Sequence, residues 1–337
     1  MDNNYTRSQR IFGFDALKAL AAFLVVLYHV GMVDLGYRTG EYYYPTLTQV
    51  LWLFTACGVP LFFMVNGALT IKRKYDLKKT MTKAGRLVVL GTFWGVVAMA
   101  LYALRDCDSS RFSFGGMSFY WFLFSLALMY LATFLLNHLP VWCAELVVCS
   151  LLIFPFATNL GWDIARLIYP EVSLPAWGHI GAFTMYGMVY MYAGHYFSDK
   201  HCKWWVNLVF AVVGLALLVI ECIAVVNAEN APYEGGNYCF PTLGALFLSV
   251  AIFCWGRYWS ASNKALCAVV SFLGNNALGI YIFHLILMIA VGWIFPQIGP
   301  TVVPAPLAVL IAIVYTFAAA LISELIRRSP LRFLLKL

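Results

Sequence analysis

The chain has 337 residues, of which 63% are hydrophobic and only 11% are charged. Soluble domains are about 25% charged, so the composition excludes an ordinary soluble protein and predicts an all-α, polytopic membrane protein. The net charge of +7 is better explained by basic cytoplasmic loops than by binding to nucleic acid. Spans and short connections account for the whole length, so residues 1–337 are expected to form a single transmembrane domain with short tails at 1–10 and 326–337.

A helix needs about 20 apolar residues to cross a bilayer, and on that measure the sequence predicts about ten spans. Seventeen of the 22 Lys and Arg residues fall in segments that are internal if the N-terminus is cytoplasmic, which places both termini inside. Pro60 and Pro155 fall within the second and fifth spans and are expected to kink them. The predicted spans are residues 11–33, 46–70, 85–104, 118–137, 141–157, 178–197, 204–227, 241–256, 275–296 and 302–325.

The first predicted span, residues 11–33, carries Asp15, Lys18 and His29. In a helix, Lys18 and His29 lie about 20° apart around the axis and about 16 Å apart along it, so they share one face. Asp15 stands one turn from Lys18, at the spacing where a carboxylate and an ammonium pair. A charge in hydrocarbon costs about 2.5–3.5 kcal/mol, so this face is expected to meet protein or water and marks a candidate functional site.

The nine cysteines are scattered and form no CxxC pair, so the sequence predicts neither a metal site nor a redox motif. Cys107 and Cys239 fall in expected outer loops. They are candidates for a disulfide if that compartment is oxidising.

Several sequence blocks occur at intervals along nearly the whole chain. They are FDALKALAAFLVVLYH with Asp15, Lys18 and His29, VPLFFMVNGALTIKRK with Asn66 and Gly67, a basic loop followed by Arg86, YWFLFSLALMY with Trp121 and Tyr130, NNALGIYIFHLIL with Tyr281 and His284, and LIRRSPLRFLL. Together these blocks resemble the acyltransferase 3 family of integral membrane O-acyltransferases. Two departures stand out: Lys83 replaces the first of two arginines that many relatives carry, and Ser118, Phe119 and Tyr120 stand where relatives often have histidine.

The resemblance implies transfer of an acyl group, most often acetyl, from cytoplasmic acyl-coenzyme A to a hydroxyl of a lipid-linked or exported carbohydrate. The expected location is the bacterial cytoplasmic membrane, and the partners are acetyl-CoA or another acyl-CoA, the glycan acceptor and membrane lipids. A sugar hydroxyl needs a base, and an imidazole has a suitable pKa, so His29 is the expected catalytic base. The sequence leaves open whether His29 acts on the acceptor directly or first accepts the acyl group.

Helix geometry places Lys18 about 10 Å and His29 about 27 Å from the inner end of the first span. A coenzyme A held at the inner mouth would extend its pantetheine arm along this face. The expected donor-binding residues are Lys18, Arg86, Lys83 and Arg73, because cations form charge-assisted hydrogen bonds with phosphates. Asp15 is expected to orient Lys18.

Each assignment has a structural alternative. Lys18 and Asp15 would also form a purely structural pair, residues 72–83 would also serve as the positive-inside signal or a lipid contact, and Arg86 would also snorkel. His284, about 14 Å into its span, either lines the donor passage, tunes His29 or only packs. Trp121, Tyr281 and Asn66 are candidate substrate contacts by resemblance.

Other polar residues have weaker assignments. His179 and His195 are expected to be interfacial, and Glu145 and Glu221 interrupt apolar spans without an assigned partner. Possible sugar contacts in the outer loops are Asp163, Arg166, Glu229 and Glu234.

Two other classes of function fit the same residues: a transporter or flippase of an amphipathic envelope precursor, and a non-catalytic membrane scaffold. The sequence identifies neither the acceptor nor the acyl group, and it leaves open whether the protein forms a homodimer.

Overall fold

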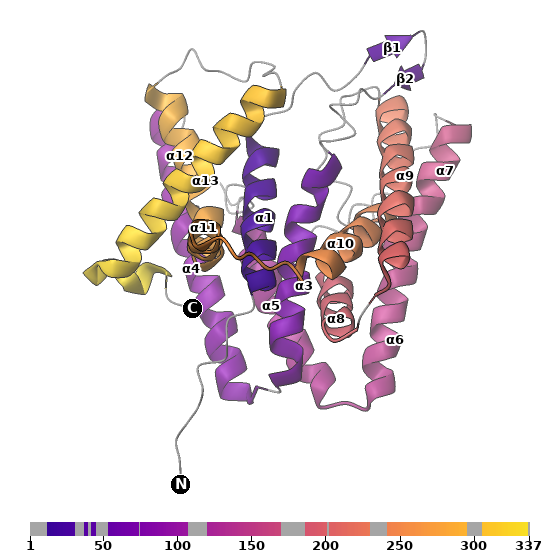
Figure 1. Ribbon diagram of the computed structural model, residues 1–337, viewed down its shortest axis with the longest axis horizontal. Helices are drawn as coiled ribbons and strands as arrows, with labels where there is room; N and C mark the ends of the chain where they lie inside the picture. Colours follow the sequence, from indigo (N-terminus) through magenta and orange to yellow (C-terminus); the bar gives the residue numbers. More distant parts are fainter. Residues whose placement is uncertain are drawn as a thin grey trace.

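The computed structural model describes residues 12–30, 37–39, 42–44, 53–73, 75–106, 120–169, 186–200, 202–229, 241–294 and 305–335. These residues form a bundle of helices (Figure 1). A small antiparallel hairpin, β1 (Tyr37–Thr39) paired with β2 (Tyr42–Tyr44), was not predicted and lies at one end of the bundle. The predicted Cys107–Cys239 pair and His179 lie outside the described residues.

Six continuous helical segments are long and apolar enough to cross a membrane, and a bent pair of helices makes a seventh. The six segments are α1 (Phe12–His29), the 3-10 helix η1 (Leu53–Cys57) running into α3 (Gly58–Thr70) and η2 (Ile71–Arg73), α4 (Leu77–Asp106), α6 (Val141–Leu151) running through η5 (Leu152–Ala157) into α7 (Thr158–Ile168), α9 (Trp204–Glu229) and α13 (Ala305–Arg328). The bent pair is α11 (Lys264–Asn275) and α12 (Ala277–Ile294). The chain is therefore a polytopic membrane protein.

Three shorter helices and a C-terminal turn complete the described part. They are α5 (Trp121–Asn137), α8 (Tyr186–Phe197), α10 (Leu243–Gly256) and the 3-10 helix η7 (Pro330–Leu335). Each of the ten predicted spans coincides with a helix, but the described parts of α5, α8 and α10 are shorter than the roughly 20 residues of a full crossing.

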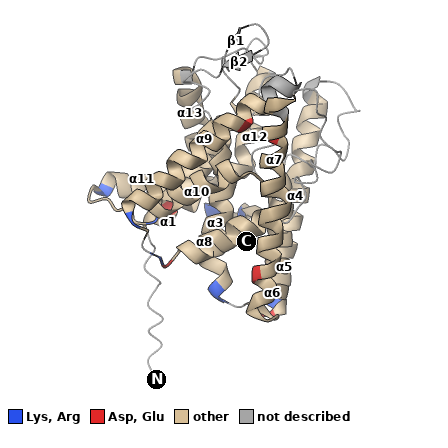
Figure 2. Ribbon diagram, turned by 90° about the vertical axis from the view of Figure 1, so that its right-hand side faces the viewer, with Lys and Arg blue, Asp and Glu red and all other residues tan. Residues whose placement is uncertain are grey.

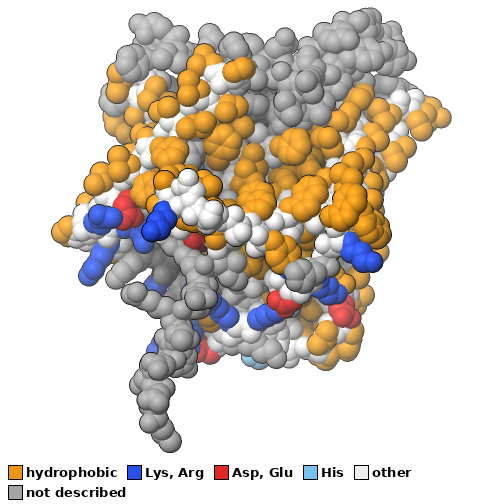
Figure 3. All heavy atoms as spheres, in the orientation of Figure 1, with side chains coloured by type: hydrophobic (Ala, Val, Ile, Leu, Met, Phe, Trp, Pro, Cys, Tyr) orange, Lys and Arg blue, Asp and Glu red, His pale blue; other side chains and the backbone are white. Residues whose placement is uncertain are grey.

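The surface carries a broad apolar belt, and the charges gather toward one end of it. Figure 3 shows hydrophobic side chains across the middle of the molecule, and exposed members include Val89, Val212 and Leu310. The Lys and Arg side chains of the described residues lie mostly in the lower half of Figure 3, and Figure 2 shows their positions along the ribbon. This asymmetry is the pattern that a positive-inside orientation produces; the cytoplasmic location of the two termini stays a prediction.

Helix α1 lies at the centre of the bundle and packs against α3, α10, α11, α12 and α13. Among residues 12–30, His29 alone is exposed. A charged side chain that faced the hydrocarbon would cost free energy, but a span surrounded by other helices avoids this cost. The fold thereby explains how α1 tolerates Asp15 and Lys18.

The structure corrects two expectations about the connections. Residues 158–168 were predicted as part of an outer loop, but they form α7, because the helix continues past Pro155 through the π-helical turn η5. A π-helical turn accommodates the proline that would otherwise break the helix. The segment after α10, predicted as a simple inner connection, contains the additional helix α11.

Pro60 lies in the second predicted span, as the third residue of α3, directly after the 3-10 turns of η1. A proline in the first turn of a helix removes an N–H group that has no partner within the helix. Pro60 therefore marks the change from 3-10 to α-helix in this span.

Candidate active site

The charged face of α1 contains the predicted ion pair. Lys18 Nζ lies 2.8 Å from Asp15 Oδ1, and the side chains are 25% and 2% exposed, respectively. Both residues belong to one continuous helix, so their spacing of three residues brings them together, as predicted. The Lys18 side chain is partly exposed, whereas the carboxylate of Asp15 is enclosed.

Two glycines, Gly274 of α11 and Gly13 of α1 itself, let neighbouring backbone approach this end of α1 closely. A Cβ on Gly274 of α11 would lie only 2.6 Å from the carbonyl oxygen of Asp15, so the approach of α11 to α1 requires glycine. On the α1 side, a Cβ on Gly13 would collide with the carbonyl of Arg257, just after α10. The backbone of Asp15 is thus packed against α11, in addition to being part of α1.

At the other end of α1, His29 meets His284 of α12. The two ring centroids are 5.1 Å apart, and the ring of Tyr28 lies 4.9 Å from that of His29. His29 is exposed, whereas His284 is completely buried. The pair therefore joins one accessible imidazole to one enclosed imidazole.

The hydrogen bond of His284 defines which of its nitrogens is available. Nδ1 lies 3.0 Å from the carbonyl oxygen of Ile280. A carbonyl can only accept, so Nδ1 carries the proton in the neutral ring and Nε2 is the acceptor nitrogen. Among the described residues, Nε2 of His284 has no hydrogen-bond partner. A group entering beside His29 would find an acceptor there.

Aromatic side chains surround His284 and place Tyr281 next to it. The ring of Tyr281 lies 5.9 Å from His284 and 5.3 Å from Phe122. Tyr120 donates a hydrogen bond from its hydroxyl to the carbonyl of Ile282 at 2.9 Å, which fixes the beginning of α5 against α12. Sequence reasoning assigned no role to Tyr120, although an aromatic residue at the start of an apolar helix was the available signal.

Trp121, a second candidate substrate contact, is half-buried at the start of α5. Its ring packs on Phe122 with centroids 6.4 Å apart. Trp121 therefore lies next to the aromatic side chains near His284 and contacts them through Phe122, the following residue.

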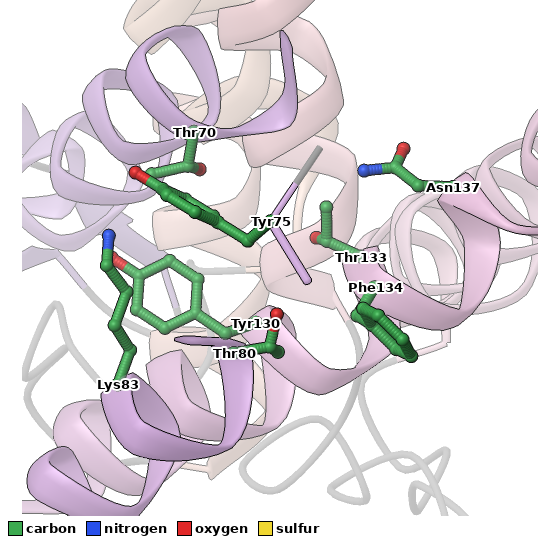
Figure 4. A pocket seen from close by; sticks show the side chains of 8 residues that line it. All are labelled: Thr70, Tyr75, Thr80, Lys83, Tyr130, Thr133, Phe134 and Asn137. Carbon is green, nitrogen blue, oxygen red and sulfur yellow. The ribbon is translucent and has the colours of Figure 1, made fainter. Parts of the chain in front are cut away.

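A second polar site lies where α3, α4 and α5 meet (Figure 4). Its cavity of about 20 Å³ holds one water-sized group. Its lining combines hydroxyl, amide, ammonium and aromatic groups from Thr70, Tyr75, Thr80, Lys83, Tyr130, Thr133, Phe134 and Asn137. We call this site the polar pocket.

Three predicted site residues converge on the polar pocket. Lys83 Nζ lies 4.0 Å from the centroid of the Tyr75 ring and 5.5 Å from that of Tyr130. Arg73 donates from Nη1 to the Tyr75 hydroxyl at 3.3 Å. Asn66 accepts a 3.0 Å hydrogen bond from the Tyr130 hydroxyl, so it is linked to this pocket rather than to the histidine pair.

The pocket also perturbs Tyr75, which lies in the connection between α3 and α4. Burial opposes ionisation of the phenol, but hydrogen bonds with Lys83 and Arg73 and their positive charges outweigh it, so the pKa of Tyr75 is lowered. The pocket is therefore electropositive. Sequence reasoning missed Tyr75, although an aromatic residue within a basic loop was a visible signal.

The remaining basic candidates differ in whether an acidic side chain pairs with them. Arg86 is exposed on α4, and the described residues offer it no hydrogen bond or ion pair. Lys72 is paired with Asp199, and Lys79 lies 3.4 Å from Asp76. Acidic partners thus already occupy part of the 72–83 cluster.

The structure also shows where three of the acidic residues with weak assignments lie. Glu221 of α9 is buried, accepts a hydrogen bond from Thr242 and lies within electrostatic range of Asp163. Asp163 is itself buried in α7, so its assignment to an outer loop was wrong. Glu145 is exposed on α6. The side chains of Arg166 and Glu229, and all of Glu234, lie outside the described residues.

Comparison with known proteins gives one match. A family model described as an acyltransferase domain matches residues 11–325 of the 337. No curated protein matches the chain, and no solved structure does. The matched range begins just before α1 and ends within α13, so it includes both the histidine pair and the polar pocket.

Proposed function

Because the chain belongs to the acyltransferase 3 family, we propose that it is a membrane O-acyltransferase with His29 as its catalytic base. The acyl group, acetyl in the simplest case, comes from acyl-coenzyme A on the cytoplasmic side. The acceptor is a hydroxyl of a cell-envelope or exported carbohydrate. The family supplies the reaction class, and the direction of transfer follows from the basic end of the bundle.

One observation carries the choice of His29. Among residues 12–30 it is the one exposed residue, and its ring lies 5.1 Å from that of His284. An activated nucleophile commonly uses a base that a third group orients. Nε2 of His284 has no hydrogen-bond partner among the described residues, so an approach of the two rings that formed an N–H···N bond would let His284 orient His29 in this way.

The reaction then proceeds as a balanced acyl transfer. His29 removes the proton of the acceptor hydroxyl while the oxygen attacks the thioester carbonyl. The new C–O bond forms, the C–S bond breaks, and the coenzyme A thiolate leaves with the proton from the His29 imidazolium. This direct route needs fewer steps than an acyl-enzyme.

The donor would enter from the basic end. Lys18, about 16 Å below His29 along α1, has a partly exposed side chain. The polar pocket offers Lys83, and Arg73 is hydrogen-bonded to Tyr75 in its lining. Cations and hydroxyl donors are the groups that bind phosphates. Arg86 provides a further exposed charge one turn beyond Lys83.

The test combines purified protein with labelled acyl-CoA and glycan fractions from envelopes of cells lacking the gene. Mass spectrometry should find an ester-sized mass increase on a glycan, and the same mass should be missing from cells without the gene. Uptake of glycan precursor into sealed vesicles without any ester product would refute the proposal and favour a transporter. Donor-dependent protection of the folded protein against heat gives an independent readout of acyl-CoA binding.

A further inference from the structure

The joint between α11 and α12 contains a buried asparagine. The two helices meet at 72°, and Asn276 lies between them with 1% of its surface exposed. Its Nδ2 donates to the carbonyl of Phe272 at 3.0 Å and to Glu324 Oε2 at 3.2 Å. Its Oδ1 accepts from Ser323 Oγ at 2.8 Å and from Arg327 Nη1 at 3.3 Å. All of the hydrogen-bonding capacity of this side chain is used.

Such a network defines a geometry more than it adds stability. Burying an amide costs free energy unless it is hydrogen-bonded, and a satisfied amide contributes little more than an apolar side chain of the same size. Its directional bonds, however, allow one orientation of the chain. Asn276 ties the C-terminal turn of α11 and the beginning of α12 to Ser323, Glu324 and Arg327 of α13.

Two glycines flank this asparagine and fix the joint on both sides. Gly274 lies against the backbone of Asp15, with space for no side chain. Gly279 lies against Ser323, which also donates to Asn276. The joint therefore connects α1, α12 and α13 at the level of the Asp15–Lys18 pair.

His284 follows Asn276 by eight residues, which is about 12 Å and just over two turns of helix. At this distance, the orientation of the joint decides where the imidazole of His284 lies relative to His29. A ring nitrogen about 6 Å from the helix axis moves by about 1 Å when the helix turns by about 10°. A misplacement of 1 Å can lower a catalytic rate by about 100-fold.

We propose that Asn276 is a positioning residue, which sets the rotation and height of α12 so that His284 faces His29. The inference rests on the proposed function, because it assigns Asn276 a role in the same histidine pair. Asn276 touches neither histidine; it acts through the helix that carries one of them.

The test compares Asn276→Ala with Asn275→Ala. Asn275 is the neighbouring asparagine, it is exposed, and its contact with Arg327 of α13 is made by its backbone carbonyl, which Asn275→Ala keeps. For each variant, kcat and KM for acyl-CoA are measured per folded molecule, quantified by size-exclusion chromatography. Hydrogen–deuterium exchange of residues 277–284 is measured on the same samples, without substrate.

For Asn276→Ala we expect kcat to fall at least 10-fold, KM to stay within about 2-fold, and exchange in residues 277–284 to rise. For Asn275→Ala we expect wild-type values. The double variant N276D with E324Q reverses the donor and the acceptor of one bond and should recover part of the kcat that N276D loses. If Asn276→Ala does not fold, Ser323→Ala, which removes one bond to Oδ1, should show a smaller loss of kcat in the same direction.

The proposal is overturned if Asn276→Ala matches Asn275→Ala in kcat, or if its loss lies in KM alone. Unchanged exchange in residues 277–284 also overturns it. A wild-type protein without any acyl transfer refutes the proposed function instead, and the exchange measurement still decides whether Asn276 fixes the start of α12.

Discussion

The Asp15–Lys18 pair allows a structural role to be separated from donor binding. Lys18→Met removes the ammonium and leaves the Asp15 carboxylate, which is 2% exposed, without a cation 2.8 Å away. Asp15→Asn keeps the shape of the carboxylate and leaves the ammonium of Lys18, whose side chain is 25% exposed. The double variant removes both charges.

The magnitudes follow from these exposures. Removing one partner of a buried pair costs about 3–5 kcal/mol, and because Lys18 is partly solvated we expect about 3 kcal/mol for Lys18→Met. Asp15→Asn should cost about 1 kcal/mol, as for a solvent-screened pair. The double variant should lie within about 1 kcal/mol of the wild type, because no charge is left unpaired.

The assay is thermal unfolding in detergent, combined with KM for acyl-CoA. At about 2 °C per kcal/mol, Lys18→Met should lower Tm by about 6 °C and the double variant by about 2 °C or less. Two single effects that simply add in the double variant would refute the coupling of the pair. If the stable double variant also keeps a wild-type KM, Lys18 has no part in donor binding.

Three further predictions concern the rest of the site and the bundle. His29→Ala should lower kcat by about 10²–10⁴-fold, the contribution of a general base, while His195→Ala in the labelled acyl-transfer assay should not; equal turnover would contradict the mechanism. Gly67→Ala places a Cβ against the backbone of α8 and should cost about 3 kcal/mol in thermal unfolding, whereas Gly85→Ala, with open space around it, should be neutral or stabilising. Tyr75→Phe removes a hydroxyl from the polar pocket and should raise KM for acyl-CoA several-fold without changing kcat; an unchanged KM would place the donor elsewhere.

The joint between α11 and α12 and the polar pocket depend on contacts between residues far apart in the chain, which the sequence alone does not reveal. Asn276 was visible only as a polar residue at the start of an apolar block, because its four partners include three from α13, about 50 residues later. The motif that contains Asn66 predicts a substrate contact, and the structure links Asn66 to Tyr130 at the polar pocket. Helix α11 was missed because its apolar run is too short to register as a span.

The sequence by itself determined the membrane environment and the face that Lys18 shares with His29. It also determined the pairing of Asp15 with Lys18, because helical geometry relates residues within one span through a fixed rise and angle. Only the tertiary structure decided that His284 lies beside His29, 255 positions earlier in the chain, and that Asn276 is hydrogen-bonded to Ser323 of α13. In a membrane, helices choose their neighbours through close packing at small residues such as Gly274 and Gly279 and through interhelical hydrogen bonds, and a single apolar sequence does not state which surfaces will meet.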